Sequence, residues 1–201
     1  MKNIQDSPTR FDGGLKQRLV DATAELLLEP RDVRLPTMRE IATRAGVTPG
    51  AAYRHFETQH QLLLAVVAQL FGQLEAHLAE SASFGAATDV GVGDARSAIR
   101  AMANAYVAWG LTNAGGYQLL FETTDELELL SHNERPGLHL LDHLAALLAH
   151  HHQSGVPMAA EATRLWTALH GVVSLRSHKT GMMWPASLEE DVDNILDPFL
   201  S

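Results

Sequence analysis

The sequence predicts an all-α protein, with a three-helix N-terminal domain followed by a larger helical domain. No stretch of the 201 residues sustains the alternation of apolar and polar side chains that a half-buried strand shows. Apolar residues instead recur at three- and four-residue intervals, the spacing of a helix that buries one face. Residues typical of helix starts and stops, such as Thr37, Gly46 and Thr48, separate these stretches.

The apolar spacing and the stop signals divide the chain into a series of helices. We expect them over residues 14–29, 37–45, 48–56, 58–81, 94–111, 117–122, 136–152, 158–179 and 187–200. Gly115 and Gly116 are expected to interrupt the chain before the short helix at 117–122. Thr37 and Glu40 form a capping-box pattern, in which the two side chains satisfy backbone N–H groups reciprocally.

A tight turn, Ala45-Gly46-Val47, joins the second and third expected helices. Gly46 supplies the left-handed backbone that such a turn needs, and Thr48 followed by Pro49 begins the next helix. Two short helices joined in this way are the helix-turn-helix arrangement, in which the second helix lies in the major groove of DNA. An ordinary helical hairpin gives the same local pattern.

Charge is unevenly distributed along the chain, whose formal net charge is −9. Residues 1–60 hold 9 Lys/Arg and 8 Asp/Glu, a net of +1, whereas residues 61–201 hold 6 and 16, a net of −10. A surface that faces a polyanion is therefore expected in the N-terminal part, although a random fluctuation would give the same split.

Cysteine content and apolar runs bear on where the protein works. The chain has no cysteine, which excludes disulfides and thiolate metal sites and gives no reason to expect secretion. The N-terminus lacks the apolar stretch of a signal peptide, and the longest apolar run, Leu62 to Ala68, is too short to span a bilayer. We expect a soluble cytoplasmic protein with no membrane partner.

The stretch LPTMREIATRAGVTPGAAYRHFETQHQLLLAVV closely resembles the DNA-binding domain of the TetR family of transcriptional regulators, over about residues 15–67. The resemblance implies a homodimeric repressor that binds a double-stranded DNA operator and is released by an unknown small-molecule effector. It places Thr37 at a cap that touches phosphate, and Tyr53 and His55 on the DNA backbone. The positions facing bases or neighbouring phosphates are Thr48, Pro49, Gly50, Ala51 and Arg54. The planar fork of Arg54 matches guanine O6 and N7, but it could equally hold a phosphate.

One position departs from the family pattern. Where the family has a lysine that clamps a phosphate, this chain has Gln59. An amide can still donate a hydrogen bond to DNA, but it carries no charge. The salt dependence of DNA binding is therefore predicted to be shallower, by roughly one unit of slope per subunit.

The segments YVAWG, GYQLLFE and LWTALHGVVSL resemble one C-terminal subgroup of the same family, marked by Trp166 followed by His170-Gly171. This resemblance implies a small-molecule pocket in the C-terminal domain. The candidate lining residues are Met102, Tyr106, Trp109, Tyr117, Phe121, Trp166 and His170. Each could instead be an ordinary core residue, and His170 could be a core histidine with its hydrogen bonds satisfied.

The last two long helices are suited to dimerisation, because residues 161–179 carry apolar groups on more than one face. Two helices from each subunit would form a four-helix interface. The candidate interface residues are Leu165, Leu169, Val173, Leu188, Val192, Ile195 and Phe199. The alternative is that both faces are buried within one subunit.

Two other functions compete with DNA binding: a helical metal-dependent enzyme and a helical interaction protein with no DNA role. His139 and His143 lie four residues apart, a spacing that can hold zinc, but only Glu134 and Asp142 are placed to add ligands. No nucleophile elbow, phosphate loop or carboxylate constellation is present. We therefore expect that the protein is not an enzyme and has neither a metal site nor a cofactor.

The expected domain organisation follows from these segments. Residues 1–12 form a flexible arm, 13–57 the helix-turn-helix domain, and 58–201 the effector-binding and dimerisation domain.

Overall fold

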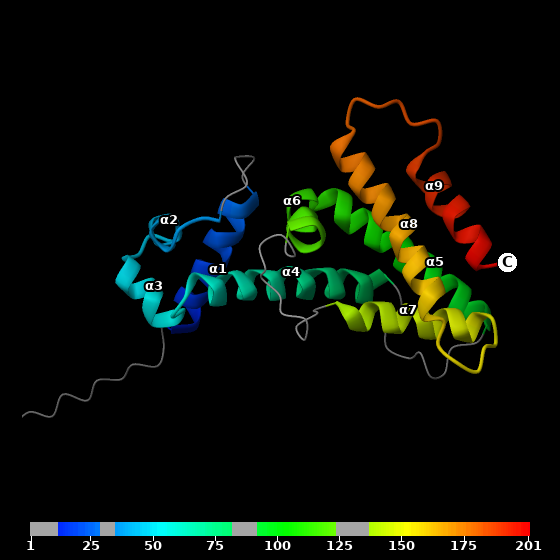
Figure 1. Cartoon of the computed structure of the whole chain (residues 1–201), viewed down its shortest axis with the longest axis horizontal. Helices are drawn as coiled ribbons and strands as arrows, with labels where there is room; N and C mark the ends of the chain where they lie inside the picture. The colour runs from blue at the N-terminus through cyan, green and yellow to red at the C-terminus, as the bar shows by residue number, and fades with distance from the viewer. Residues whose placement is uncertain (1–11, 29–34, 82–91, 124–136) are drawn as a thin grey trace, which may run out of the picture.

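The computed structural model describes residues 12–28, 35–81, 92–123 and 137–201, and within them the chain is helical with no strand (Figure 1). The helices are α1 (Asp12–Leu28), α2 (Met38–Arg44), α3 (Pro49–His55), α4 (Gln59–Ser81), α5 (Val92–Thr112), α6 (Ala114–Gln118), a π-helical turn (Leu119–Thr123), α7 (Leu138–His151), α8 (Ala159–His178), α9 (Leu188–Leu196) and a 3-10 turn (Asp197–Phe199). The predicted all-α class is confirmed, and every expected helix has a counterpart.

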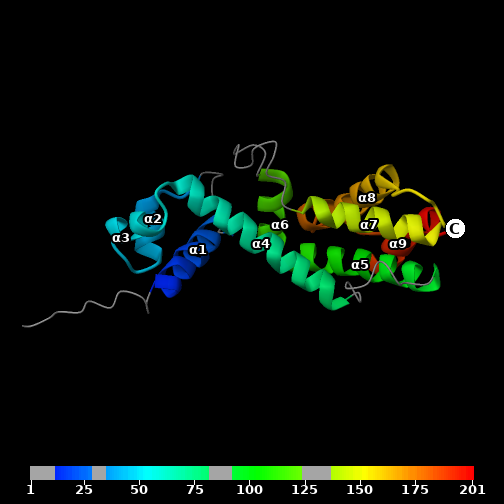
Figure 2. The ribbon, with the colours of Figure 1, turned by 90° about the horizontal axis from the view of Figure 1, so that it is seen from below.

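Two groups of helices are connected by α4. The short helices α1, α2 and α3 gather at one end of the molecule, and α5 to α9 form the other end. Seen from below in Figure 2, α4 runs from the first group into the second. It packs against α1 in the first group and against α5 in the second. A displacement of α4 would therefore move the two groups relative to each other.

By length and hydropathy alone, α4 could cross a membrane, because an 18-residue window within its 23 residues has a mean hydropathy of 1.5. Its apolar side chains are used inside the protein instead. Leu62, Val66 and Leu74 are completely buried, and Leu78 is 1 % exposed. We therefore interpret α4 as a core helix that serves both groups.

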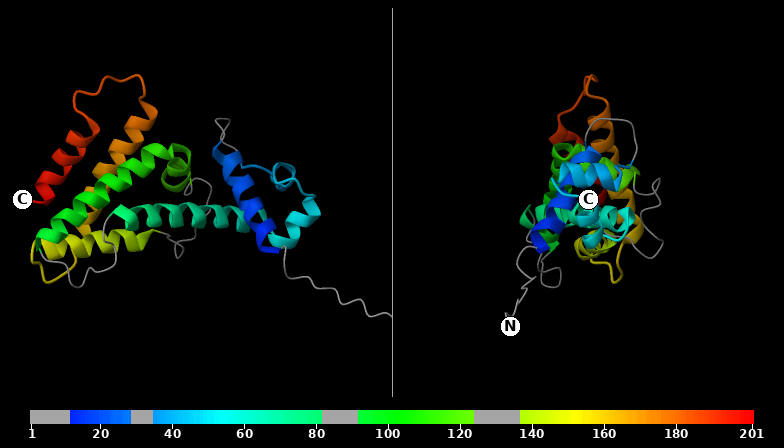
Figure 3. Two further views of the ribbon diagram at one scale, coloured as in Figure 1. Left: turned by 180° about the vertical axis from the view of Figure 1, so that it is seen from behind. Right: turned by 90° about the vertical axis from the view of Figure 1, so that its left-hand side faces the viewer.

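In the larger group, α6 and α8 both approach α5 very closely at Gly110. A Cβ atom on Gly110 would lie 2.6 Å from Val173 Cγ1 and 2.9 Å from a ring carbon of Tyr117. Only glycine therefore lets α5 lie this close to both α8 and α6. Figure 3 shows the same group from behind, with α6 at the end of α5 and facing α1, which it contacts.

The predicted interruption at Gly115 and Gly116 is wrong, since both residues lie inside α6. The break between α5 and α6 lies at Asn113, directly before α6, where the backbone is not helical (φ −114°, ψ 46°). A Cβ on Gly116 would lie 3.2 Å from a methyl group of Leu70. This glycine therefore lets α6 lie close to α4, which is a packing role that composition alone does not reveal.

Two expectations fall largely outside the described residues. Of the N-terminal arm predicted at 1–12, the structure describes only Asp12, which begins α1. The segment between the helices expected at 58–81 and 94–111 is not described up to residue 91, and Val92 already begins α5.

Candidate functional sites

The turn between α2 and α3 follows directly from its sequence. Gly46 has a left-handed backbone (φ +70°). Its N–H bonds the carbonyl of Thr43 at 3.1 Å, and the N–H of Val47 bonds the carbonyl of Ala42 at 2.9 Å. This pair of bonds is the Schellman motif, which satisfies the last carbonyls of α2 and turns the chain sharply. The predicted tight turn at Gly46 is confirmed.

The short helix α3 has one buried side and one open side. Thr48 caps its start by accepting the N–H of Ala51 at 3.2 Å, with Pro49 at the first helical position. Ala52 is completely buried, and Phe56, just past the helix, is 4 % exposed. The small alanine lets α3 lie close to α2, while Phe56 anchors its far end in the core.

The open side of α3 presents polar and small groups to solvent. The exposed residues are Pro49, Gly50, Tyr53 and Arg54. They fall at i, i+1, i+4 and i+5, which places them on one face of the helix. Tyr53 is 53 % exposed, so its ring lies outside the core. His55, the last residue of the helix, is half-buried.

Two exposed arginines, one on α2 and one on α3, pair with no carboxylate among the described residues. Arg54 is exposed on α3, and Arg39 is exposed in the first turn of α2. Arg44, in contrast, bonds Glu25 at 3.3 Å. Arg39 did not stand out in the sequence beyond its contribution to the charge. Its exposure in the first turn of α2 becomes apparent only in the fold.

Thr37 and Glu40 form the predicted capping box at the start of α2. The Thr37 hydroxyl accepts the N–H of Glu40 at 3.3 Å and donates its hydrogen to the Glu40 carboxylate at 2.8 Å. A phosphate that takes this hydrogen has to replace Glu40 as the acceptor. The expected phosphate contact of Thr37 therefore competes with the cap.

Gln59 is held within the domain. Its side-chain Nε2 donates to the carbonyl of Pro36 at 2.7 Å, which ties the first residue of α4 to the segment that leads into α2. The expected contact of Gln59 with DNA therefore has only its second amide hydrogen available. No local sequence signal indicates this bond, because the two residues are 23 positions apart.

Five of the seven candidate pocket residues meet in one aromatic cluster between α5, α6 and α8. The cluster consists of Tyr106, Tyr117, Phe121, Trp166 and His170. The ring centroid of Phe121 lies 4.8 Å from that of Tyr117 and 6.1 Å from that of Trp166. The other two candidates, Met102 and Trp109, are 7 % and 4 % exposed in the surrounding core.

Hydrogen bonds connect Trp166, Tyr106, Tyr117 and His170 within this cluster. The indole N–H of Trp166, which can only donate, bonds the Tyr106 hydroxyl at 3.0 Å. The hydroxyls of Tyr106 and Tyr117 bond each other at 2.9 Å, and either of them can be the donor. The Tyr117 hydroxyl also bonds Nδ1 of His170 at 2.5 Å. Burial raises the pKa of Tyr106 to about 12, so this hydroxyl keeps its hydrogen at neutral pH.

The expected dimer interface needs correction. Leu165, Leu169, Val173 and Val192 are at most 4 % exposed within a single chain, so they cannot contact a partner. They fill the core between α8, α9 and the helices beneath. The other three candidates, Leu188, Ile195 and Phe199, are half-buried against this core and keep part of their surface free.

The two histidines with zinc-ligand spacing, His139 and His143, do not lie in a metal-binding arrangement. His139 Nε2 lies 3.2 Å from a carboxylate oxygen of Glu75. Burial lowers the pKa of His143, which favours the neutral ring. Within the described residues, no group of three or more His, Cys, Asp or Glu side chains is placed to hold a metal ion.

The fold and its N-terminal site define a helical DNA-binding regulator of the helix-turn-helix class. A family model described as "Bacterial regulatory proteins, tetR family" matches residues 19–66, and one described as "Tetracyclin repressor-like, C-terminal domain" matches residues 99–199. The chain belongs to the TetR family of transcriptional regulators, as its sequence suggested.

Solved structures share this fold at low sequence identity. A putative TetR-family transcriptional regulator from Mesorhizobium loti is 17 % identical, with a TM-score of 0.64 over 95 % of this chain and 97 % of that one. A TetR family member from Streptomyces coelicolor is 20 % identical, with a TM-score of 0.67 over 93 % and 98 %. A protein of unknown function from Rhodococcus is 22 % identical, with a TM-score of 0.65 over 97 % of both chains. No curated protein matches the chain.

Proposed function

We propose that the protein is a cytoplasmic, homodimeric transcriptional repressor that binds a two-fold symmetric operator and leaves it when a small-molecule effector binds. The observation that carries this proposal is the open face of α3. A buried alanine and a buried phenylalanine fix the helix from behind, and its exposed face offers a phenol and a guanidinium. Such a slim polar face suits the major groove.

We propose that some side chains recognise bases, whereas others contact the DNA backbone and position the protein. Arg54 reads a base edge or holds the neighbouring phosphate, and the Thr48 hydroxyl donates from the start of α3. Tyr53 and His55 contact the backbone, as does Arg39 from the first turn of α2. Guanidinium and hydroxyl donors of this kind supply most protein contacts to phosphate. The exposed, unpaired state of Arg39 and Arg54 among the described residues supports these roles.

We place effector sensing at the aromatic cluster. The cluster joins α5, α6 and α8, and α6 also contacts α1 of the DNA-binding group. An effector that prefers a different position of α6 would therefore change the position of α1 and the spacing of the two recognition helices. It lowers operator affinity only by its difference in affinity for the two arrangements.

We propose that the dimer interface lies on the outward side of α8 and not on its buried apolar face. A Cβ on Gly171 would meet no described atom within 4 Å, so this glycine leaves an open surface. Leu175 is 51 % exposed, and Met182 and Met183 follow at 53 % and 93 %. Exposed apolar side chains gathered at one end of a helix are typical of a contact surface. The half-buried Leu188 and Ile195 of α9 would extend it.

A bulky side chain at Gly171 tests this interface. Gly171→Leu should fold normally and yield a monomer by size-exclusion chromatography with light scattering, because the added side chain blocks the partner helix. Gly72→Leu is the matched control, since Gly72 is also a helical glycine with open space at Cβ among the described residues. A Gly171→Leu protein that stays dimeric would remove α8 from the interface.

A footprint on the DNA upstream of the protein's own gene tests the function itself. We expect two protected half-sites related by two-fold symmetry and centred about 34–36 Å, or a multiple of it, apart. Uniform protection that disappears with competitor DNA would leave only non-specific binding and would overturn the proposal.

A further inference from the structure

Lys16 of α1 lies beside the end of α3. Its ammonium nitrogen is 5.5 Å from the centre of the Phe56 ring, and Phe56 directly follows α3. Figure 1 shows the start of α1 next to the end of α3, and the two helices are in contact. Lys16 is exposed, whereas Phe56 is only 4 % exposed. The lysine therefore places its positive charge at the surface, next to the last turn of α3.

This charge is available to an anion. Among the side chains that the structure describes, no carboxylate pairs with the Lys16 ammonium. The next carboxylate along α1, that of Asp21, instead accepts the amides of Gln17 at 2.9 Å and Gln69 at 3.2 Å. The contact of Lys16 with Phe56 involves an aromatic ring only, so it leaves the three ammonium hydrogens able to bond an incoming oxygen.

The dimensions of α3 place this charge near the DNA backbone. The helix has seven residues, so it is about 10 Å long. The major groove is about 12 Å wide, and phosphates border it on both sides. A group beside the end of a helix in this groove is therefore within reach of one border. The flexible four-carbon stem of a lysine suits a contact to a single phosphate.

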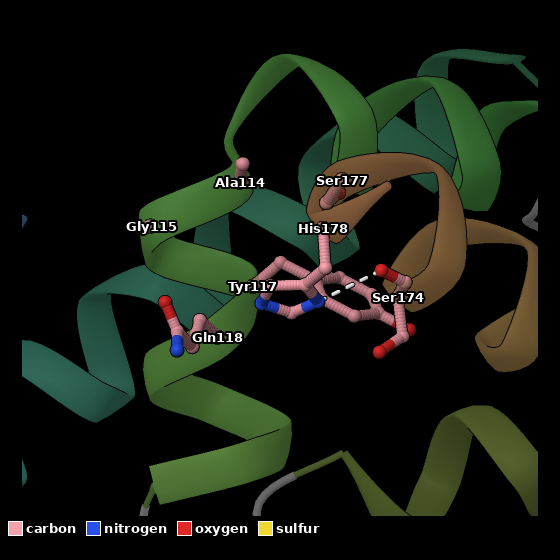
Figure 4. Close-up of a pocket in the computed structure, with 7 residues that line it drawn as sticks. All are labelled: Ala114, Gly115, Tyr117, Gln118, Ser174, Ser177 and His178. Carbon is pink, nitrogen blue, oxygen red and sulfur yellow. Dashed lines mark hydrogen bonds between the residues drawn. The ribbon is translucent and has the colours of Figure 1, made fainter. Parts of the chain in front are cut away.

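The hollow in the other group of helices lacks such a cation. It lies between α6 and the last turns of α8 (Figure 4), and none of its lining residues is Lys or Arg. The Nδ1 atom of its His178 bonds the carbonyl of Ser174 at 2.8 Å. This hollow is therefore unsuited to a phosphate, in contrast to the surface beside the end of α3.

We propose that Lys16 binds a backbone phosphate of the operator beside the end of α3, once in each half-site. It is a positioning residue, because a phosphate contact carries no base information and strengthens specific and non-specific binding alike. The contact extends the DNA-binding surface from the helix-turn-helix to α1. This assignment rests on the proposed function, since it requires that α3 binds DNA.

The salt dependence of DNA binding tests the contact. Lys16→Met keeps an apolar stem over Phe56 and removes the charge, so the slope of log affinity against log salt concentration should fall by about 0.9 per subunit in an anisotropy titration. The operator and a scrambled duplex should lose affinity by the same factor. Lys16→Arg should retain the natural slope.

Arg18→Met is the matched control, because Arg18 is also an exposed cation of α1 but lies two residues further along, on a different face of the helix. It should lower the slope less than Lys16→Met does. A fall in Lys16→Met no larger than that in Arg18→Met would overturn the contact.

Neutral methylphosphonates, placed one at a time in the operator, locate the phosphate. At one position in each half-site, the substitution should weaken the natural protein but should not weaken Lys16→Met further, because both changes remove the same interaction. Additive effects at every position would overturn the contact. The proposed function fails by a different result, equal affinity of the natural protein for the operator and the scrambled duplex.

Discussion

Gly46 sets the angle between α2 and α3, because its left-handed backbone lets the last carbonyls of α2 bond the turn. The position is open to solvent, and an added Cβ would meet no described atom within 4 Å. Its requirement for glycine therefore comes from the backbone alone and is independent of packing.

We predict that Gly46→Ala lowers the free energy of unfolding by about 1–2 kcal/mol, the cost of a left-handed backbone for a residue with a Cβ. Chemical denaturation measures this change. Gly50→Ala is the control with the opposite sign, because Gly50 lies in α3 with open space at Cβ, and alanine there should add about 0.5–1 kcal/mol. Equal stability of Gly46→Ala and the natural protein would show that the turn rearranges freely.

Tyr106 makes stability depend on alkaline pH. Burial raises its pKa from 10.0 to about 12, so the folded protein keeps a proton that the unfolded chain releases. The resulting stabilisation is complete below pH 10 and is lost as the pH rises towards 12. Tyr106→Phe should therefore show a smaller fall in the free energy of unfolding between pH 10 and 12, measured by denaturation at each pH. Tyr53→Phe, which removes an exposed tyrosine, serves as the control, and equal slopes for both variants would contradict this account.

At the scale of elements, the capped helices could be predicted from sequence and the packing of their faces could not. The Thr37–Glu40 box, the Gly46 turn and the Thr48 cap are all local patterns, and each forms as expected. Local hydrogen bonds decide such features, so a few neighbouring residues contain the necessary information.

The apolar faces of α8 show why the packing between helices could not be predicted from sequence. Leu165 and Val173 look the same in sequence whether they face a partner or the core, and they proved to be fully buried within one chain. The sequence predicts the members of the aromatic cluster only as candidates for a pocket lining, and their hydrogen bonds join positions as far apart as 106 and 166. Such long-range pairs leave no periodic signal in the sequence.

The start of α4 offers a test of the missing lysine. Gln59→Lys adds one positive charge beside the proposed DNA surface, so each subunit should neutralise one more phosphate. The plot of log affinity against log salt concentration should then steepen by about 0.9 per subunit, measured by fluorescence anisotropy. An unchanged slope would show that position 59 stays bonded to Pro36 and never reaches DNA. Gln61→Lys, an exposed neighbour whose natural side chain accepts the Glu57 N–H at 3.0 Å, is the control for added charge alone.

At the scale of the whole molecule, charge and shape both orient the protein on DNA. The net charge of −10 in residues 61–201 repels a polyanion, and the near-neutral first 60 residues hold the exposed arginines of α2 and α3. These short helices form one end of the molecule, with the acidic part at the other end of α4 (Figure 1). Of the two described ends of the molecule, the α3 end is therefore the one suited to approach a duplex.

The central claim, that α3 binds the operator through its open face, is tested most directly by an anisotropy titration of upstream DNA with Arg54→Ala and Lys179→Ala. Both variants lose one positive charge per subunit, but Lys179 is exposed at the end of α8, outside the helix-turn-helix domain. We predict that Arg54→Ala weakens specific binding by at least about tenfold, in line with about 1–3 kcal/mol per lost contact, and that Lys179→Ala binds like the natural protein. Equal affinities for the two variants would contradict the claim.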